Sequence, residues 1–388
     1  MTIDKLLIEE ERLCFKYFYE NTYNGLTKDK YPKNPAIASI SATGYFLAAL
    51  VIGINNNWIS YNLGYSHTLT TLNTLLDLEN KKGFFYRYIN IKTKKRALNS
   101  EISIIDTGLL LCGILLVSEY FKGEIKMKAD KLYNRVNWNW YIDKNKKLFH
   151  LGYKPNRGFL GYWDNYAEQL ILYILASGSK THPIDKEIYY SFKRNKKNDI
   201  IYSWFGSLFT YQVSHAWIDF KDTYDSDNIN WFDNSIKAVR ANTKYCNDNK
   251  NLFNTFKLGY FGLSSTITNK GYKGKYGAYP YMDKVRIDGT ISLSALISSI
   301  IFTPKKVKKT ILKLYNDYPN SFGKYGFITS VNLRKRKPWF SDEYLGIDKG
   351  TTMIMIENYF NNTIWNLLMN NDYIKEGMNK LNIKKIDK

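Results

Sequence analysis

Two acidic side chains, Asp164 and Glu168, stand four residues apart just before the apolar run LILYILA. The pattern predicts a helix over residues 164–176, and that spacing would place both carboxylates on one helical face. Apolar neighbours and a second carboxylate both raise the pKa of an acid, as a general acid at neutral pH requires. The alternative is that Asp164 caps the helix while Glu168 pairs with a Lys or Arg.

Further acids stand at the predicted starts of apolar segments. Glu101 and Asp106 lie five apart in LNSEISIIDTGLLL, and Asp106 directly precedes an apolar stretch. A buried carboxylate must be hydrogen-bonded, so Asp106 is expected either to cap a helix or to belong to a polar site. Asp288, in DGTISLSA, has the same two interpretations. Asp348 is expected on a loop flanked by glycines, and Glu357 in the helix that follows it.

A third group combines a histidine, an acid and aromatic residues. His215 and Asp219 stand at positions i and i+4 with Trp217 between them, which favours a sugar-binding cluster. Aromatic faces can cover the apolar faces of sugar rings, although an aromatic residue on a helix is by default part of the core. The candidate platforms are Trp163, Tyr166, Tyr211, Trp217 and Trp231. The four histidines form no metal-ligand motif, so we expect neither a metal nor a cofactor.

Apolar periodicity predicts about a dozen helices that would position these residues. The expected helices cover 6–18, 39–54, 65–80, 102–121, 125–138, 164–176, 205–218, 233–247, 290–301, 304–314, 351–368 and 372–380. Segments rich in Leu and small residues alternate with amphipathic, charged ones. An inner ring of buried helices and an outer ring with one solvated face would produce this alternation. The sequence therefore predicts an all-α fold, an (α/α)6 barrel or toroid.

Shorter segments between the helices indicate the rim of that barrel. The strand-like stretches 83–91 and 147–153 predict short hairpins, and residues 258–281, rich in Gly and Tyr, predict a loop on the substrate side. No Gly, Ser or Pro linker divides the chain, so residues 1–388 are expected to form a single catalytic domain.

Composition excludes several classes of protein. Hydrophobic residues make up 44% of the 388 residues, which is too apolar for a disordered chain. The net charge of +21 is dispersed along the chain, so we expect no nucleic-acid binding. Such binding would show an affinity for DNA that depends strongly on salt concentration. Cys14, Cys112 and Cys246 have no CxxC spacing and are expected as buried free thiols.

The apolar stretches 43–54 and 104–117 are too short or too interrupted to span a bilayer, which takes about 20 apolar residues, so no membrane contact is expected. The first residues, MTIDKLLIEEERLC, are acidic where a secretion signal is basic. We therefore expect a cytoplasmic monomer, or a periplasmic or secreted one if a leader has been removed.

An ordered series of segments resembles the motifs of the glycoamylase-like domain family, which includes glycoside hydrolase family 144. The segments are SISATGYFLAALVIGINNNWIS, GFFYRYINIKTKKRALNSEISIIDTGLLLCG, ADKLYNRVNW, WDNYAEQLILYILASGSKTHPI, GSLFTYQVSHAWIDF, WFDNSIKAVRAN, DGTISLSALISSIIFTP, FGKYGFITSVN and YLGIDKGTTMIMIENY. The resemblance extends from about residue 8 to residue 380. It implies an (α/α)6 barrel that cleaves β-1,2-glucan within the chain, with inversion.

The resemblance also implies roles for individual residues. Glu168 and Asp348 would belong to the active site, with Glu101 as a further acid. Residues implied to line the pocket are Asp106, His215, Asp219, Asp288 and Glu357. One motif departs from the family pattern: WGLTASDG is FGLSSTIT here, so Phe261 replaces the Trp and the motif's Asp is missing near Ile267.

These observations lead to a mechanistic hypothesis. Glu168 would protonate the leaving oxygen, while Asp348 or Glu101 activates a water on the opposite face of the sugar. One alternative keeps the fold but changes the reaction, to phosphorolysis, to transglycosylation of the same glucan or to hydrolysis from a chain end. Another is a glycan-binding protein without activity, which the altered FGLSSTIT motif suggests.

Overall fold

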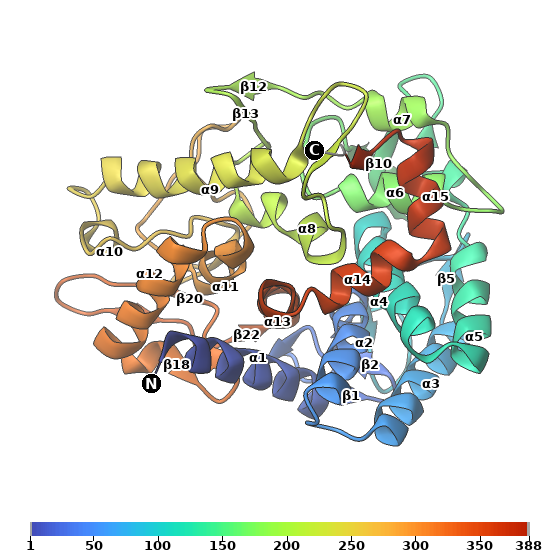
Figure 1. Cartoon of the computed structure of the whole chain (residues 1–388), viewed down its shortest axis with the longest axis horizontal. Helices are drawn as coiled ribbons and strands as arrows, with labels where there is room; N and C mark the ends of the chain where they lie inside the picture. Colours follow the sequence, from blue (N-terminus) through green and yellow to red (C-terminus); the bar gives the residue numbers. More distant parts are fainter. Residues whose placement is uncertain (1, 386–388) are drawn as a thin grey trace.

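The computed structural model describes residues 2–385, which form a mainly helical protein with fifteen α-helices. The helices are α1 (Ile3–Glu20), α2 (Ile40–Asn55), α3 (Tyr61–Asp77), α4 (Ile104–Phe121), α5 (Gly123–Asn134), α6 (Leu170–Ser177), α7 (Lys186–Tyr190), α8 (Val213–Trp217), α9 (Trp231–Asp248), α10 (Asn254–Lys257), α11 (Leu293–Ser298), α12 (Pro304–Asp317), α13 (Gly346–Phe360), α14 (Thr363–Asn370) and α15 (Asp372–Lys380). The chain runs round the molecule from the blue N-terminal helices through green α6 and yellow α9 to orange α12 (Figure 1).

The expected alternation of buried and amphipathic helices is present. Almost every residue of α2, α4, α6, α8, α11 and α13 is buried, whereas α1, α9 and α12 bury only one face. Helices that are apolar on all sides can be stable in water only when other elements surround them. The six buried helices therefore form the core, and the amphipathic helices cover it.

Specific contacts join neighbouring buried helices. Gly44 of α2 and Gly113 of α4 let these helices touch, because a Cβ atom on Gly113 would lie 2.2 Å from the carbonyl oxygen of Gly44. The Asn358 side chain on α13 donates to the Ala216 carbonyl of α8 at 2.9 Å. Gln212, which precedes α8, donates to the Ala295 carbonyl of α11 at 2.7 Å. These buried bonds fix the relative positions of helices that are distant in the sequence.

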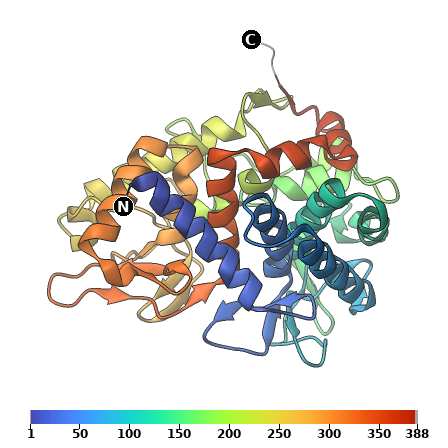
Figure 2. The ribbon, with the colours of Figure 1, turned by 60° about the horizontal axis from the view of Figure 1, so that its bottom comes forward.

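Short strands connect the ends of the helices. They are β1 (Thr22–Tyr23), β2 (Leu26–Thr27), β3 (Lys30–Tyr31), β4 (Ile37–Ser39), β5 (Asn80–Lys81), β6 (Phe84–Phe85), β7 (Tyr88–Asn90), β8 (Ile102–Ser103), β9 (Ile142–Asp143), β10 (Leu148–Lys154), β11 (Gly158–Tyr162), β12 (Lys196–Lys197), β13 (Ile200–Ile201), β14 (Thr223–Tyr224), β15 (Thr266–Thr268), β16 (Gly271–Lys273), β17 (Ile291–Ser292), β18 (Phe322–Gly323), β19 (Gly326–Phe327), β20 (Ser330–Asn332), β21 (Trp339–Phe340), β22 (Tyr344–Leu345) and β23 (Lys384–Lys385). The blue and orange strands extend below the helices in Figure 2. The hairpin predicted near 147–153 is β10 paired with β11, and the strand-like stretch 83–91 contains β6 and β7.

Several helix predictions differ from the structure. The helix predicted over 205–218 is a short 3-10 helix, Leu208–Tyr211, followed by the five-residue α8, and the helix predicted over 290–301 is the shorter α11. The helix predicted from Asp164 begins only at Leu170, because the Gln169 side chain binds the backbone of the preceding turn. Asp348 lies in the first turn of α13 and not on a loop. The helix predicted over 351–368 is two helices, α13 and α14, separated at Asn362, which adopts a left-handed conformation with φ of 55°.

Helix α4 is longer than its apolar pattern predicted, so the prediction that it is too short to span a membrane was wrong. The apolar pattern ended at Val117, but α4 continues to Phe121 and is long and apolar enough to cross a membrane. This is weak evidence for a span, because 83% of the 18-residue window is buried inside the protein, as in a core helix. The three cysteines are buried free thiols, as predicted.

Candidate active site

A cavity of about 330 Å³ opens where the ends of several buried helices meet the rim strands. Its wall is formed by β8 and the start of α4, Glu168 just before α6, the 203–210 loop, the β15–β16 hairpin and the start of α13. All three predicted catalytic acids, Glu101, Glu168 and Asp348, line it, and so does Asp106. The sequence separates these acids by up to 247 positions, and the fold brings them together.

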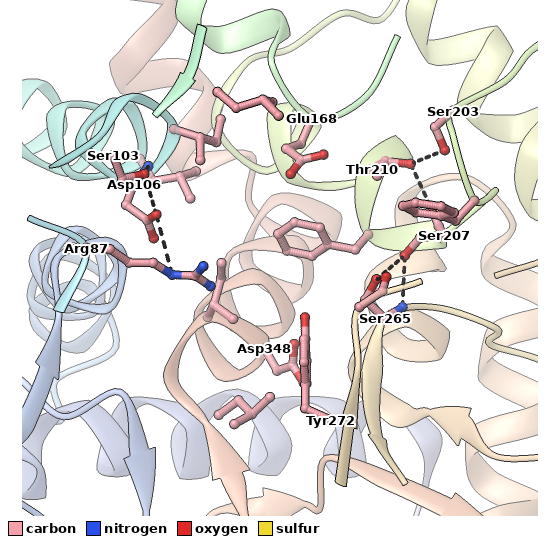
Figure 3. Close-up of a pocket in the computed structure, with 18 of the residues that line it drawn as sticks. Arg87, Ser103, Asp106, Glu168, Ser203, Ser207, Thr210, Ser265, Tyr272 and Asp348 are labelled. Atoms are coloured by element: carbon pink, nitrogen blue, oxygen red, sulfur yellow. Dashed lines mark hydrogen bonds and ion pairs between the residues drawn. The ribbon is translucent and has the colours of Figure 1, made fainter. Parts of the chain in front are cut away.

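Glu168 occupies one side of this cavity, two residues before α6 (Figure 3). The backbone around it is held by the Gln169 side chain, which accepts from the Ala167 N–H at 2.7 Å and donates to the Asn165 carbonyl at 2.7 Å. The pKa of Glu168 is raised to about 7, chiefly by burial and in part by the negative charge of Asp106, while the positive charge of Arg87 opposes the shift. Glu168 therefore retains its proton at a pH where an ordinary glutamate is ionised.

Asp348 lies across the cavity from Glu168 (Figure 3). The Ser294 hydroxyl on α11 donates to the Asp348 carbonyl at 2.9 Å and fixes the first turn of α13. Burial raises the pKa of Asp348 to about 7; the positive charge of Lys349 opposes this shift, and the negative charge of Asp29 adds to it. Among the described residues, no group forms a hydrogen bond with Asp348 Oδ2, although this atom is buried. The hydrogen-bonding capacity of this carboxylate oxygen is therefore not met by the described residues.

Arg87 places a positive charge beside two acids of the cavity wall, Glu101 and Asp106. Its Nε atom lies 3.8 Å from Asp106 Oδ2, and its Nη1 atom lies 3.7 Å from Glu101 Oε1. Asp106 raises the pKa of Arg87 strongly, so this guanidinium is charged. Ser103 caps α4 by accepting from the Asp106 N–H at 3.1 Å, and its hydroxyl donates to Asp106 Oδ2 at 2.6 Å. Asp106 thus belongs to a polar site, and its interpretation as a helix cap was wrong, because Ser103 is the N-cap of α4.

The opposite wall is rich in hydroxyl groups. Thr210 donates to the Ser203 hydroxyl at 3.0 Å, and Ser207 accepts from the Ser265 N–H at 2.9 Å (Figure 3). Gly206, with φ of +61°, lets this loop touch the next one, because a Cβ atom there would lie 1.8 Å from the Ala278 carbonyl oxygen. The predicted substrate-side loop 258–281 contributes Ser265, Tyr272 and Gly274 to the cavity.

Sequence reasoning missed three charged or aromatic residues of this region. Arg87 and Tyr272 line the cavity. Asp29 lies close enough for its charge to affect Asp348, and burial raises its own pKa to about 6. Arg87 stands in the strand-like stretch GFFYRYINI as its only charged residue, which could have singled it out. Nothing in the local sequence around Asp29 or Tyr272 indicates their position.

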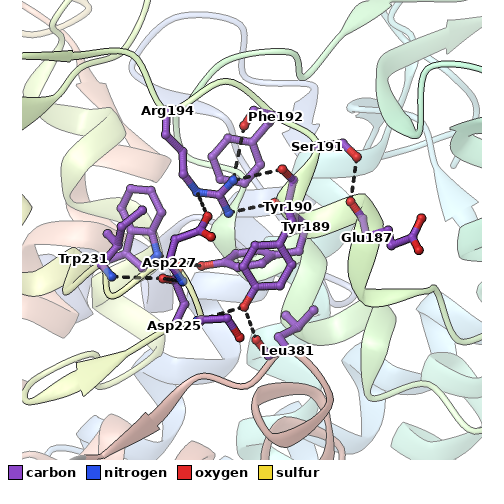
Figure 4. A network of polar contacts seen from close by, with 12 residues as sticks. Glu187, Tyr189, Tyr190, Ser191, Phe192, Arg194, Asp225, Asp227, Trp231 and Leu381 are labelled. Atoms are coloured by element: carbon purple, nitrogen blue, oxygen red, sulfur yellow. Dashed lines mark hydrogen bonds and ion pairs between the residues drawn. The ribbon is translucent and has the colours of Figure 1, made fainter.

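Most predicted aromatic platforms lie in the core and not in the cavity. Tyr166 is fully buried and stacks on Trp231, with ring centroids 4.7 Å apart. The indole N–H of Trp231 donates to the Tyr189 hydroxyl at 2.8 Å, within the polar network around Arg194 (Figure 4). Trp163 is buried behind Trp204, a cavity residue, with ring centroids 5.8 Å apart. Tyr211 is likewise buried.

The predicted His215 cluster lies outside the cavity as well. His215 is buried, its Nε2 atom lies 2.9 Å from the Ser235 hydroxyl, and burial lowers its pKa to about 3. Trp217 is fully buried against Tyr45. α8 ends at Trp217, so Asp219 does not share a helical face with His215, and its carboxylate accepts from the Lys221 N–H at 3.0 Å.

The remaining predicted residues also have partners elsewhere. Glu357 is buried and accepts hydrogen bonds from the side chains of Asn361 and Thr363. Asp164 accepts from the Asn165 side chain at 2.8 Å. Asp288 accepts from Lys273 at 2.9 Å and does not cap α11, whose N-cap is Ser292. Phe261 is 1% exposed and lines a separate cavity beside α9 and α12.

The chain resembles a known protein family and several characterised proteins. Residues 161–372 match the Glycoamylase family model, which describes a glucoamylase-type protein. A curated relative, the exo β-1,2-glucooligosaccharide sophorohydrolase (non-reducing end) of Parabacteroides distasonis, is 24% identical over 98% of this chain. The chain spans 58% of the length of that relative.

Solved structures share the fold. The endo-β-1,2-glucanase of Chitinophaga pinensis, in complex with sophorotriose and glucose, superposes with a TM-score of 0.88 at 24% identity, over 99% of both chains. The β-1,2-glucanase of Parabacteroides distasonis superposes with a TM-score of 0.87 at 23% identity, over 98% of this chain and 60% of that chain.

Proposed function

Because the chain belongs to the Glycoamylase family, we propose that it is a glycoside hydrolase that cleaves β-1,2-glucan with inversion. Two kinds of observation support the proposal. The curated relative and the solved structures carry names that refer to β-1,2-glucans. Independently, two acids with raised pKa values face each other across one cavity, which is the arrangement that carries the proposal.

We also propose that the buried helices α2, α4, α6, α8, α11 and α13 form the inner ring of an (α/α)6 barrel. The contacts of α2 with α4, α6 with α4 and α8, and α13 with α2, α8 and α11 support this arrangement. The hydrogen bond from Gln212 to Ala295 supports closure between α8 and α11. Residues 1–388 would then form one catalytic domain with the cavity at one end of the barrel.

Glu168 is the proposed general acid. A group that protonates the leaving oxygen must carry a proton at working pH, and a pKa of about 7 meets that condition near neutrality. The carboxyl group faces the cavity and forms no ion pair with a Lys or Arg of residues 2–385, which does not support the interpretation of Glu168 as an ion-pair partner.

Asp348 is the proposed general base, in preference to Glu101. It lies across the cavity from Glu168, and its buried Oδ2 atom has no protein partner among the described residues. A water held there would attack from the face opposite the acid, as inversion requires, with the two carboxyl groups separated by about 6.5 to 9.5 Å or more. Glu101 lies beside Arg87, which suits it better to binding sugar hydroxyls together with Asp106.

The experiment that tests the function is incubation of the protein with linear β-1,2-glucan, followed by thin-layer chromatography. We expect short oligosaccharides from the native protein and none from Glu168→Gln. A ladder of products indicates cleavage within the chain, as we predict, whereas a single small product indicates attack from an end. Products that require phosphate would mean phosphorolysis, and binding without products would mean a glycan-binding protein.

A further inference from the structure

The β15–β16 hairpin (Thr266–Thr268 and Gly271–Lys273) carries an aromatic side chain into the cavity. Tyr272 lines the cavity, yet 63% of its surface is exposed, because the ring stands in the open space and not in the core. Figure 3 shows the ring beside Asp348, with its hydroxyl directed into the cavity. This position contrasts with Tyr166 and Trp231, whose faces are covered by each other.

Neither the ring nor the hydroxyl of Tyr272 is engaged by the protein. Among the described residues, no hydrogen bond reaches the hydroxyl, and no aromatic ring or cation packs against the ring faces. Desolvation within the cavity raises the pKa of Tyr272 to about 12, and the charges of Asp348, Arg87 and Glu168 also act on it. An aromatic side chain that has free faces and lies close to both catalytic acids is available for a ligand.

The hairpin that carries Tyr272 is held rigidly at its base. The Ser330 hydroxyl donates to the Ile267 carbonyl, and the Ser265 hydroxyl donates to the Gly274 carbonyl at 2.5 Å. Lys273, the next residue along, forms an ion pair with Asp288 at 2.9 Å. The position of the Tyr272 backbone is therefore fixed before any ligand arrives, which reduces the entropic cost of binding.

Ile267 lies directly opposite Tyr272 in the β15–β16 pair. Ile267 is 7% exposed, whereas Tyr272 is 63% exposed. The hairpin therefore buries the side chain of its first strand and leaves the Tyr272 ring uncovered.

We propose that Tyr272 forms a sugar subsite, in which one face of its ring packs against the apolar face of the glucosyl unit on the Asp348 side. This inference rests on the proposed function, because it assigns that unit to the glucan being cleaved. The contact is made by the ring, so the hydroxyl contributes little. Tyr272 acts by binding and positioning the substrate, and it does not exchange a proton with it.

The test uses three variants of the full chain. Tyr272→Ala is expected to raise KM for β-1,2-glucan by about 10-fold or more, with kcat changed by less than about 3-fold. Tyr272→Phe keeps the ring and should stay within about 3-fold of the native KM. Lys270→Ala, at the exposed turn of the same hairpin, is the matched control and should match the native protein. Tyr272 packs against no ring, so thermal unfolding of Tyr272→Ala should equal that of the native protein.

Direct binding separates this proposal from the proposed reaction. The dissociation constant of β-1,2-gluco-oligosaccharide is measured by calorimetry in Glu168→Gln, with and without Tyr272→Ala. Cleavage by the native protein together with an unchanged KM and dissociation constant in Tyr272→Ala would overturn the subsite alone. Absence of cleavage together with binding that depends on Tyr272 would overturn the hydrolase and support the subsite. Absence of both binding and cleavage would overturn both.

Discussion

Two groups of buried acids flank the N-terminal part of α13, and they differ in what surrounds them. On the cavity side, Glu168 and Asp348 have few protein partners. On the side of α1, Glu10 accepts from Lys349 at 2.8 Å and from the Phe327 N–H at 2.6 Å, and Glu11 lies beside Glu357. Asp348 and Lys349 are adjacent in the sequence, yet Asp348 belongs to the cavity group and Lys349 pairs with Glu10 of the other group.

Burial raises the pKa of acids in both groups, so a raised pKa by itself does not identify a catalytic residue. What distinguishes Glu168 and Asp348 is that they face an open cavity. Glu10 instead meets a buried lysine, a backbone N–H and the Cys14 thiol, which leaves no place for a substrate. The first group is available for chemistry, and the second stabilises the packing of α1 on α13.

The largest expected effect concerns the cavity group. Asp348→Asn should lower kcat by about 100-fold to 10,000-fold, because a positioned general base is lost. Circular dichroism should show an unchanged fold. Asp342→Asn is the control, since Asp342 is exposed and stands six residues earlier in the chain. Full activity of Asp348→Asn would transfer the role of base to Glu101.

The α1 group should respond in stability and not in catalysis. Glu10→Gln leaves the buried Lys349 without its ionic partner, so we expect the free energy of unfolding to fall by about 3 to 5 kcal/mol. Glu9→Gln, at a neighbouring, partly exposed position that pairs with Arg12, should cost less than about 1 kcal/mol. Urea denaturation measures both. If Glu10→Gln kept its stability and lost activity as completely as Asp348→Asn, the division between the two groups would be wrong.

The dependence of activity on pH sharpens the assignment of roles. Glu168 must be protonated and Asp348 ionised, and both have pKa values raised to about 7. A plot of kcat/KM against pH should therefore be a narrow bell centred near pH 7, falling about tenfold per pH unit on each side. An acidic limb that appeared only below about pH 5 would indicate a base with an ordinary pKa.

The smallest effect is on stability at alkaline pH. Glu168 has a higher pKa in the folded protein than in the unfolded chain, so its protonation stabilises the fold below the ordinary pKa of 4.5. This stabilisation is lost as the pH rises through about 7. At alkaline pH the folded protein must hold a buried, ionised Glu168, which costs free energy, whereas the glutamine of Glu168→Gln cannot ionise. The free energy of unfolding of Glu168→Gln should therefore exceed that of the native protein by about 2 kcal/mol at pH 8 and by much less at pH 5. Equal stabilities at both pH values would show that Glu168 is not desolvated.

Local pattern predicted some helices to within one or two residues and others only roughly. α15 (Asp372–Lys380) has the predicted bounds, and α2 and α9 differ from prediction by one or two residues at their ends. The start of α6 was missed, because Gln169 folds back on the preceding turn and replaces helical hydrogen bonds with side-chain ones. No periodicity argument contains that information.

The site was predicted in part. The resemblance identified Glu168, Asp348, Glu101 and Asp106, all of which line the cavity. Pattern alone could not separate them from Glu357 or His215, because a polar residue beside aromatic ones looks the same whether it faces a cavity or the core. Tyr166 and Tyr272 illustrate this: both are tyrosines near Gly or acidic residues, but only Tyr272 faces the cavity.

By itself the sequence determined the helical class, the alternation of buried and amphipathic helices, the buried thiols and the acids available for chemistry. These properties depend on residues within about one helix length of each other, where spacing fixes the face on which a side chain lies. Only the tertiary structure decided which acids meet, that Arg87 lies between two of them, and that Asp348 faces the cavity while Lys349 faces α1. Those outcomes depend on contacts between segments hundreds of residues apart, which packing of the whole chain alone establishes.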